Sequence, residues 1–265
     1  MPHATCLFRQ TPFYPRPEFA EGLRRHGYDV SNKRPHSFGP DDLLLIWNRN
    51  RQFEPIAAQY EAAGARVLVA ENGYIDRTDD RKAKYYALAL NRHNGAGRWF
   101  IGDKARFEIS EEPWRKRGDH ILVLPQRGIG SQGVRMPSAW VPDIMKRLHR
   151  ITDRPIKLRH HPGHRKHQRD DLLEALNGCH AAVTWGSGAG IKSLRAGIPV
   201  FHELDKWIGN CAARRLVDNV ENVHMPDRTE LWRRVSWGQW TLPEIATGEA
   251  FDRLLHAEDR DLLRL

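Results

Sequence analysis

The sequence has few cysteines and no long apolar run. Cys6, Cys179 and Cys211 are the only three cysteines among 265 residues, too few and too scattered for a disulfide framework or a cysteine-based zinc site. A reducing, cytoplasmic environment is therefore expected. No uncharged apolar stretch approaches the roughly 18 residues of a membrane-spanning helix, and the N-terminal MPHATCLFRQTPFY lacks the apolar core of a signal peptide. We expect no membrane insertion.

The chain also lacks a balance of charge. It carries 42 lysines and arginines against 33 acidic residues, a formal net charge of +9, and 14 histidines. Such an excess suits an anionic partner such as a nucleic acid, a nucleotide or an acidic glycan. Solvated arginines on an ordinary surface would give the same excess. The apolar fraction of 40% is enough for a sizeable core and excludes wholesale disorder.

Apolar runs alternate with amphipathic stretches, which is typical of β-α units around parallel sheets. We expect strands over 4–9, 43–47, 66–70, 121–124, 156–159, 181–185 and 199–201, and helices over 18–26, 54–63, 138–151, 169–176 and 189–196. The charged region 76–119 contains EEPWRKRG, which has the composition of a linker. The prediction is an α/β protein with two Rossmann-like domains, 1–118 and 119–240, facing a central cleft, and a helical C-terminal tail, 241–265.

The strongest motif is AAVTWGSGAGIKSLRAGIPVF over 181–201. A strand, a Gly/Ser turn and a helix start follow one another, and the unpaired N–H groups of a helix start attract phosphate. The glycines let a ligand approach the backbone, and Ser187 and Lys192 add donors. A tight turn without a ligand is the alternative. A Walker A loop is rejected because Ile191 stands where that motif needs glycine. The glycines that would let a ligand approach the backbone of this turn are Gly186, Gly188 and Gly190.

A second glycine cluster, GIGSQG over 128–133, matches the dinucleotide fingerprint in its letters. However, Met136-Pro137-Ser138 delays the following helix, and the next expected strand ends in basic residues, so NAD(P) binding is disfavoured. We expect a ligand-contacting loop with Gln126 and Ser131 as its polar contacts.

A basic segment, RHHPG over 159–163, follows the next expected strand. Arg159 and His161 are candidates to donate hydrogen bonds to a phosphate, and HRKH over 164–167 adds positive charge. A solvated basic loop is the alternative. No carboxylate or cysteine completes a zinc ligand set here, so no metal is expected.

In the first half, Glu71-Asn72-Gly73-Tyr74 comes directly after the expected strand 66–70. A carboxylate at the end of a strand is a good general base, although it can also cap a turn. His93 lies in a polar loop, 91–97, that could close over a ligand. Aromatic residues and arginines alternate near the ends of the expected strands 4–9 and 43–47. Such a mixture suits stacking on bases or sugars and pairing with phosphates. We expect exposure of Phe13, Tyr14, Arg49 and Arg51, and burial of Phe8 and Trp47.

The second half resembles the nucleotide-sugar-binding domain of GT-B glycosyltransferases of the capsule-polysaccharide and Kdo-transferase type. The resemblance spans about 121–201 and is carried by His161-Pro162, Ser187 and SLRAGIPVF over 193–201. It implies that the His-Pro segment and the Ser/Gly turn hold the donor phosphates. Glu71-Asn72-Gly73-Tyr74 looks like the Glu-Asp-Gly-Phe segment of capsule transferases, with Asn72 in place of Asp. The segment WGQWTLPEI over 237–245 is similar to tails of small phage-encoded transferase-like proteins. Phage glycosyltransferases of this fold include enzymes that glycosylate hydroxymethylated bases in DNA.

The resulting hypothesis is a nucleotide-sugar-dependent glycosyltransferase of the cytoplasm, or of the host cytoplasm if phage-encoded. The first domain would take the acceptor and the second the donor, a UDP-sugar in preference to a CMP-sugar, without a metal or other cofactor. Glu71 would be the catalytic base. The acceptor would be a hydroxymethylpyrimidine in DNA, and Arg49, Arg51 and the basic segment 115–117 would contact the DNA phosphates. The acceptor-binding set is Phe13, Tyr14, Arg49, Arg51 and His93. The donor-binding set is Gln126, Ser131, Arg159, His161, Gly186, Ser187, Gly188, Lys192 and Glu203, the last for the ribose hydroxyls.

Three alternatives remain. The acceptor could be a glycan or a lipid-linked sugar, which predicts weak DNA binding with a shallow salt dependence. The protein could instead be a non-catalytic nucleic-acid-binding protein of the same fold, because the fold does not settle activity. An NAD-linked sugar enzyme is the third, and it predicts stabilisation by NAD.

Overall fold

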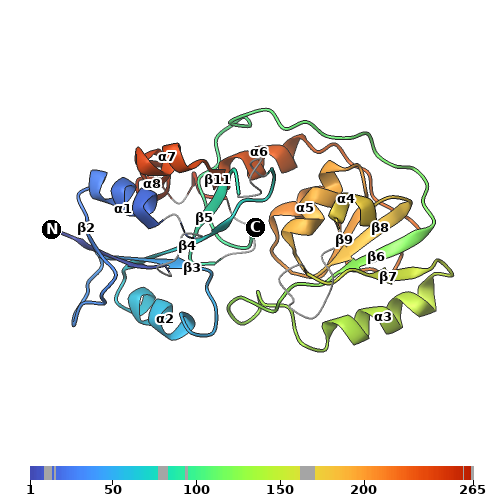
Figure 1. The fold of residues 1–265 in the computed structure, drawn as a ribbon, viewed down its shortest axis with the longest axis horizontal. Helices are drawn as coiled ribbons and strands as arrows, with labels where there is room; N and C mark the ends of the chain where they lie inside the picture. Colours follow the sequence, from blue (N-terminus) through green and yellow to red (C-terminus); the bar gives the residue numbers. More distant parts are fainter. Residues whose placement is uncertain are drawn as a thin grey trace. The chain divides into compact units, whose positions relative to one another are not determined.

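The computed structural model describes residues 1–8, 14, 16–76, 83–92, 95–161, 171–258 and 260–263. The chain forms two compact units (Figure 1). Unit 1 comprises Met1–Arg106 and Arg233–Leu265, and unit 2 comprises Phe107–Trp232. Each unit is built on its own sheet of mainly parallel strands, so the predicted α/β class with two Rossmann-like domains is confirmed. Within the described ranges, no helix has both the length and the apolar character needed to cross a membrane.

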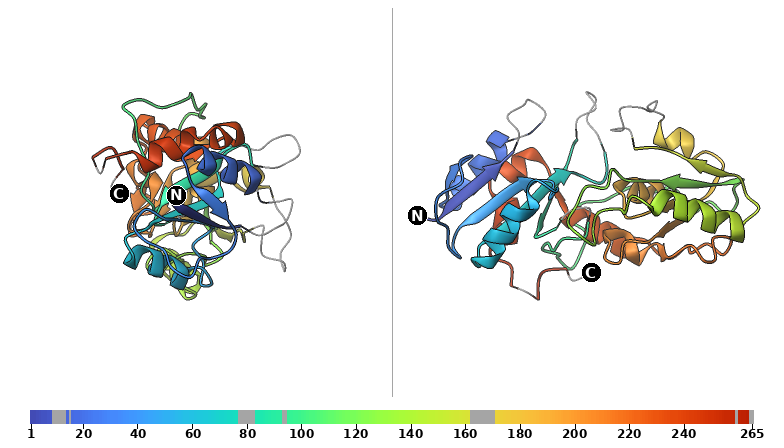
Figure 2. Two further views of the ribbon diagram at one scale, coloured as in Figure 1. Left: turned by 90° about the vertical axis from the view of Figure 1, so that its left-hand side faces the viewer. Right: turned by 90° about the horizontal axis from the view of Figure 1, so that it is seen from below.

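The sheet of unit 1 has the strand order β11-β5-β4-β3-β1-β2. Its strands are β1 (His3–Leu7), β2 (Asp29–Ser31), β3 (Leu43–Trp47), β4 (Arg66–Asn72), β5 (Tyr86–Leu90) and β11 (Gln239–Trp240). The first four are parallel, and β5 and β11 add an antiparallel edge. Helix α2 (Glu54–Ala62) covers one face, and α1 (Arg16–Arg25), α7 (Leu242–Ala246) and α8 (Glu249–Leu255) cover the other (Figures 1 and 2). Because both faces are covered, β3 is apolar and buried over its first four residues.

The C-terminal residues complete unit 1. Trp240 pairs with Tyr86 in the sheet, and Thr241 and Glu244 form a capping box that starts α7. Gly22 in α1 lets this segment approach, because a Cβ there would lie 2.6 Å from the Phe251 ring. The predicted helical tail over 241–265 contains the two short helices α7 and α8, which pack against α1, and the edge strand β11 directly precedes it.

The sheet of unit 2 has the order β10-β9-β8-β6-β7 and is parallel throughout. Its strands are β6 (His120–Leu124), β7 (Ile156–Leu158), β8 (Cys179–Thr184), β9 (Val200–His202) and β10 (Arg214–Arg215). Helix α3 (Trp140–Ile151) packs Trp140, Ile144 and Leu148 into a core with Val183 and Phe201. Helices α4 (Leu172–Ala175) and α5 (Gly188–Arg195) lie on the opposite face of the sheet (Figure 1). The 3-10 helix η1 (Ile208–Cys211) follows in unit 2, and α6 (Thr229–Trp237) contains the boundary at Arg233 where the chain returns to unit 1.

Residues 107–119 pack along unit 2. The Trp114 indole donates to the Pro226 carbonyl (3.0 Å), and the Arg228 guanidinium lies 4.1 Å from the Trp114 ring and pairs with Glu111 (2.9 Å). The carbonyl of Pro113 lies so close to Gly197 that a Cβ there would be 2.0 Å from it. The EEPWRKRG segment therefore belongs to the second unit, and the division at Arg106 differs from the one expected at Gly118 because Trp114 anchors the segment.

Candidate functional site

The parallel strands of unit 2 end at one edge of the sheet. Thr184 in β8 is in register with Leu124 in β6 and with His202 in β9, and Leu158 in β7 is in register with Val123 in β6. The segments after these strands therefore start side by side. Ligands of open parallel sheets bind at this edge, and the sequence-predicted donor-binding residues all lie on segments that follow β6, β7, β8 or β9.

The turn between β8 and α5 is held by side-chain hydrogen bonds. Thr184 donates through Oγ1 to the Leu124 carbonyl (3.1 Å) and accepts from the Ser187 N–H (3.1 Å). Ser187 is the N-cap of α5, and its Oγ accepts from the Ala189 N–H (3.1 Å). This capping arrangement fixes the start of the helix at Gly188.

The three glycines of this turn differ in their surroundings. A Cβ on Gly186 would lie 2.7 Å from Leu204, and one on Gly190 would lie 2.9 Å from Trp207, so packing accounts for both glycines. A Cβ on Gly188 would meet nothing within 4 Å, and its φ is not left-handed. No hydrogen bond of the described residues involves the Gly188 N–H. Gly188 is therefore where a ligand can reach the positive end of α5.

The loop after β6 contributes two buried polar atoms. Ser131 is 8% exposed, and neither its Oγ nor the Oε1 of Gln126 has a hydrogen-bond partner within the described residues. A buried polar atom without a partner costs about 1–3 kcal/mol, so both atoms favour a ligand or a water molecule. The loop is tied to β8 by the Trp185 indole, which donates to the Val134 carbonyl (2.8 Å).

The G-x-G-x-x-G letters in this loop have a backbone explanation. The three glycines adopt φ values of 67°, 141° and 80°, which side-chain-bearing residues rarely adopt. The next helix, α3, begins at Trp140, well after the motif. The geometry therefore lacks the helix start inside the motif that a dinucleotide fingerprint needs. The glycines concerned are Gly128, Gly130 and Gly133.

Basic groups add to the charge at this edge. Lys192 lies one helical turn after Gly188, on the same face of α5, and is half-buried. Arg159 and His161 follow β7 and are also half-buried, and the Arg159 N–H donates to the Val123 carbonyl (3.0 Å). Pro162 and the residues 163–167 lie outside the described part of the chain. Their predicted contribution stays a prediction.

Glu203 is bound to α3. Its Oε2 accepts from the Trp140 indole (2.8 Å), and its Oε1 accepts from Arg147, which also pairs with Asp218 (3.0 Å). Glu203, Trp140 and Arg147 line a surface pocket of about 510 Å³ together with Trp185. Lys146 of α3 also lines this pocket. Glu203 therefore positions α3, and its predicted contact with a ribose stays a prediction.

His202 was not singled out by sequence reasoning. It is buried at the end of β9, and burial lowers the pKa of its imidazole to about 4. At neutral pH the ring is uncharged, so Nδ1–H donates to the Leu204 carbonyl (3.0 Å). This bond holds the backbone that follows β9. The only signal in the sequence is a histidine that ends an apolar strand.

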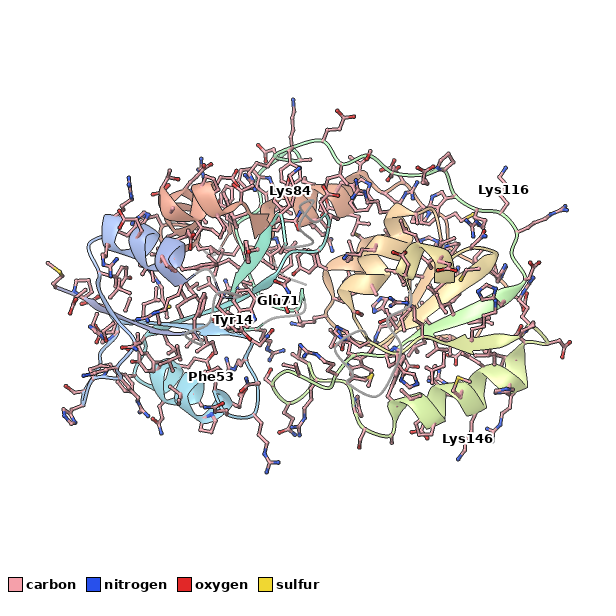
Figure 3. All side chains as sticks on the ribbon, in the orientation of Figure 1. Tyr14, Phe53, Glu71, Lys84, Lys116 and Lys146 are labelled. Atoms are coloured by element: carbon pink, nitrogen blue, oxygen red, sulfur yellow. The ribbon has the colours of Figure 1, made fainter. Side chains whose placement is uncertain are left out.

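In unit 1, Glu71 lies within β4 rather than in a turn, in register with Ala87 of β5 (Figure 3). Its side chain is half-buried. Burial, and then the charge of Glu71, raise the pKa of the buried Tyr74 hydroxyl well above its usual value. Beside this strand end, Asn48 adopts a left-handed φ of 61°, and its N–H donates to the Ala70 carbonyl (2.9 Å). A partly solvated carboxylate at a strand end can accept a proton.

The prediction that Arg49 is exposed is wrong. Its side chain is 7% exposed and pairs with Glu54 (2.9 Å) and Glu61 (2.6 Å), and it donates to the Asn91 carbonyl (2.6 Å). Burial lowers the pKa of the Arg49 guanidinium, but the hydrogen bonds and charges of Glu61 and Glu54 outweigh it and raise the pKa above its ordinary value. Arg49 is thus a structural cation.

Of the other predicted acceptor-binding residues, the structure describes two, Arg51 and Tyr14. Arg51 is exposed, and Tyr14 is half-buried with its ring edge-to-face against Trp47 (5.1 Å). Phe13 and His93 lie outside the described residues. The expected burial of Phe8 is confirmed, whereas Trp47 is half-buried.

Comparison with known proteins bears on the fold. No protein-family model and no curated protein matches this sequence. Solved structures do match. One is Thermosulfurimonas dismutans KpsC, beta Kdo 2,4 transferase, with 12% identity, 89% of this chain and 90% of that chain covered, and a TM-score of 0.53. Another is Thermosulfurimonas dismutans KpsC, beta Kdo 2,7 transferase, with 13% identity and a TM-score of 0.50. The match covers 95% of this chain and 99% of that chain.

The chain has the fold of these glycosyltransferases. The match agrees with the resemblance to Kdo transferases that the His-Pro, Ser/Gly and SLRAGIPVF segments carry. It gives no support to the resemblance to phage DNA glycosyltransferases.

Proposed function

We propose that the protein is a glycosyltransferase that binds a nucleotide-sugar donor at the carboxyl edge of the unit 2 sheet. The observation that carries this proposal is the open, capped start of α5 at Gly188, together with the buried and unpartnered polar atoms of Ser131 and Gln126. Phosphate oxygens accept from helix N–H groups and from a serine hydroxyl. The Gln126 oxygen can accept from a hydroxyl or amino group of the donor. The shared fold supports the same reading.

In the proposed reaction, Glu71 takes the proton of the acceptor hydroxyl. The acceptor oxygen forms a bond to the anomeric carbon of the sugar while the bond from that carbon to the phosphate oxygen breaks. The electron pair of the broken bond goes to the leaving phosphate, and the start of α5 with Lys192 and Arg159 stabilises its charge. A UDP-sugar is the first candidate donor and a CMP-sugar the second.

The acceptor proposal changes once Arg49 is placed. A hydroxymethylpyrimidine in DNA drew support from Arg49, and this arginine is committed to Glu54 and Glu61. The net charge of +9 and the exposed Arg51 remain in favour of DNA. The fold shared with two Kdo transferases favours a glycan hydroxyl. We therefore favour a glycan acceptor and retain DNA as the second candidate.

Donor binding is the direct test. Thermal unfolding is measured with UDP, CMP, GDP, NAD and a short DNA duplex, each in the presence of EDTA. A ligand at about 100 times its Kd adds about 2.7 kcal/mol to the free energy of unfolding. Stabilisation by one nucleotide supports the transferase and identifies the donor class. Stabilisation by NAD alone favours an NAD-linked enzyme, and stabilisation by DNA alone favours a nucleic-acid-binding protein.

The role of Glu71 needs a separate variant. Glu71→Gln removes the base and keeps the shape of the side chain, so transfer should be lost while the nucleotide-induced thermal shift is retained. Glu108→Gln, at an exposed position of unit 2, is the matched control and should keep both. Loss of nucleotide binding in Glu71→Gln would contradict the assignment of Glu71 as the base.

A further inference from the structure

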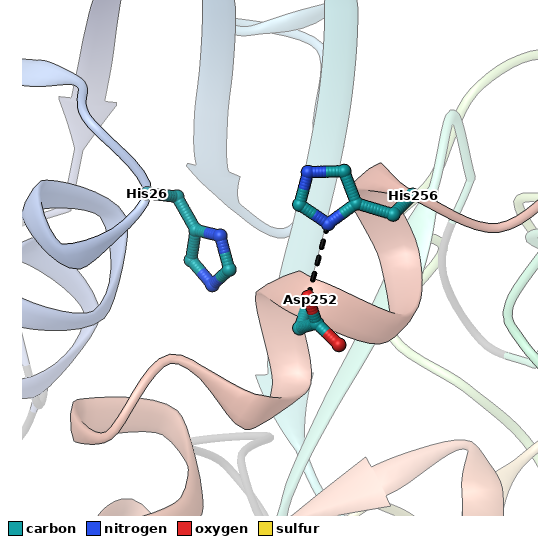
Figure 4. Close-up of side chains that lie close together, drawn as sticks. All are labelled: His26, Asp252 and His256. Atoms are coloured by element: carbon teal, nitrogen blue, oxygen red, sulfur yellow. Dashed lines mark hydrogen bonds and ion pairs between the residues drawn. The ribbon is translucent and has the colours of Figure 1, made fainter.

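Three potential metal ligands meet in unit 1, and none of them belongs to the proposed donor-binding or acceptor-binding residues. They are His26, which follows α1, Asp252 in α8, and His256, which follows α8 (Figure 4). One ligand atom from each lies within 4.8 Å of the others. We propose that these three residues form a binding site for a divalent transition metal, with Zn²⁺ as the reference ion. This site goes beyond the glycosyl transfer proposed above.

Packing brings the three side chains together. Asp252 and His256 are four residues apart, so they lie on the same side of α8. His26 reaches them because α1 packs against α7 and α8, and its Nε2 lies 2.8 Å from the carbonyl of Gly248. Gly248 has a left-handed φ of 89° and is the N-cap of α8. The same contact therefore fixes both the start of α8 and the position of the His26 ring.

The hydrogen bonds set the tautomer that a metal requires. A carbonyl only accepts, so Nε2 of His26 carries the proton and Nδ1 keeps its lone pair. Metal-bound histidines commonly donate their other ring N–H to a backbone carbonyl in this way. Nδ1 of His256 lies 3.0 Å from Oδ1 of Asp252. In the metal-bound form the ion takes the place of the proton between these two atoms, and that proton moves to Nε2 of His256 or to solvent.

The dimensions suit a small transition-metal ion. With metal–ligand bonds of about 2.0–2.2 Å, neighbouring ligand atoms in a tetrahedron lie about 3.4 Å apart. The 3.0 Å pair of His256 and Asp252 is close to this value. These two side chains are 66% and 56% exposed, so rotation can close the remaining gap to His26. Two imidazoles and one carboxylate favour Zn²⁺, Ni²⁺ or Co²⁺ over Ca²⁺ and Mg²⁺, and the fourth position is left for water.

The proposed ion would join distant parts of the chain. It would hold the end of α1 to α8, and so attach the C-terminal helices to the N-terminal part of unit 1. An ion that binds only the folded state stabilises it. The consequence is a metal-dependent stability of the full chain, separate from donor binding.

The test uses the full chain, made without a histidine tag, stripped with EDTA and dialysed. Zn²⁺ binding is measured by calorimetry, and Co²⁺ serves as an absorption probe of coordination geometry. Wild type should bind about one more Zn²⁺ per chain than His256→Ala. Its Tm should rise by roughly 5–10 °C at about 100 times the Kd, and Asp252→Asn should show a smaller rise.

His149→Ala is the matched control. His149 is also exposed near a helix C-terminus, and it contacts the Met145 carbonyl through Nδ1 (2.7 Å). It should keep the wild-type Zn²⁺ stoichiometry. Because His26 also supports Gly248, the test uses the two exposed ligands instead. Equal stoichiometry and equal Tm shifts in wild type and His256→Ala would overturn the site. The nucleotide measurements in EDTA are independent of this result, so the two proposals fail separately.

Discussion

Replacing Gly188 by alanine tests whether a ligand binds at the start of α5, because this substitution should impair binding without impairing folding. Gly188 is the first residue of α5, has open space where a Cβ would lie, and has no left-handed φ. Alanine fits such a position, and it restricts the unfolded chain more than glycine does. Substitutions of this kind add about 0.4–1 kcal/mol to the free energy of unfolding. Gly188→Ala should therefore be as stable as wild type or more so, as measured by urea unfolding.

The same methyl group should impair nucleotide binding. It would occupy the space through which a phosphate reaches the Gly188 N–H. We expect the Kd of the stabilising nucleotide to rise at least about tenfold, which corresponds to about 1.4 kcal/mol, as measured by calorimetry. Higher stability combined with weaker binding is the signature of a residue kept for a ligand rather than for the fold.

Two further glycines serve as controls. A Cβ on Gly39 in unit 1 would also meet nothing within 4 Å, so Gly39→Ala should keep the wild-type Kd. Gly186→Ala should lose about 1–3 kcal/mol of stability, because its methyl group would lie 2.7 Å from Leu204. If Gly188→Ala binds the nucleotide as tightly as wild type, the start of α5 does not hold the phosphate and the donor site is misplaced.

Two other predictions concern buried charge. The pKa of His202 is lowered to about 4 against about 6.5 in the unfolded chain, so the unfolded state takes up the proton first as the pH falls. The contribution of His202 to the free energy of unfolding is fully present above about pH 6.5 and is reduced by about 2 kcal/mol at pH 5. The loss levels off below about pH 4. Urea unfolding of His202→Asn should show a smaller loss between pH 7 and pH 5, and equal losses would contradict this. Arg49→Met should lower the free energy of unfolding by about 2–3 kcal/mol, because Glu54 and Glu61 lose their partner, while Arg51→Met should not. Unchanged stability with weaker acceptor binding would restore the sequence-based role of Arg49.

Elements with long apolar runs were predictable. The strand expected over 43–47 is β3, and the helix expected over 138–151 is α3 from Trp140. The apolar run of β3 follows Gly39-Pro40-Asp41-Asp42, and the amphipathic α3 follows Pro137-Ser138, so hydrophobic pattern and local start signals together place both elements. β5 was missed because its YALAL lies inside a charged region, and β11 was missed because a two-residue edge strand has no period.

The site was predictable where chemistry and position are both local. Ser187 was singled out because it lies in a Gly/Ser turn between a strand and a helix start, where unpaired N–H groups attract phosphate, and the structure adds that it is the N-cap of α5. Arg49 was misread because its partners lie on α2, and nothing local to Arg49 shows that Glu54 and Glu61 turn toward it. Burial of a long basic side chain depends on such tertiary pairs. His202 was missed for the same reason, since its neutral state comes from burial.

The glycines of the 181–201 motif show how structure sorts residues that sequence treats alike. Gly186 and Gly190 face side chains at less than 3 Å from a Cβ, and Gly197 combines a left-handed φ of 71° with the Pro113 carbonyl. Each is required by the fold whether or not a ligand binds. Only Gly188 of these four has neither constraint and also stands at a helix start. A motif that resembles a family signature can therefore be retained largely for packing, and the proposed phosphate site rests on Gly188, the one glycine of these four that packing leaves unexplained.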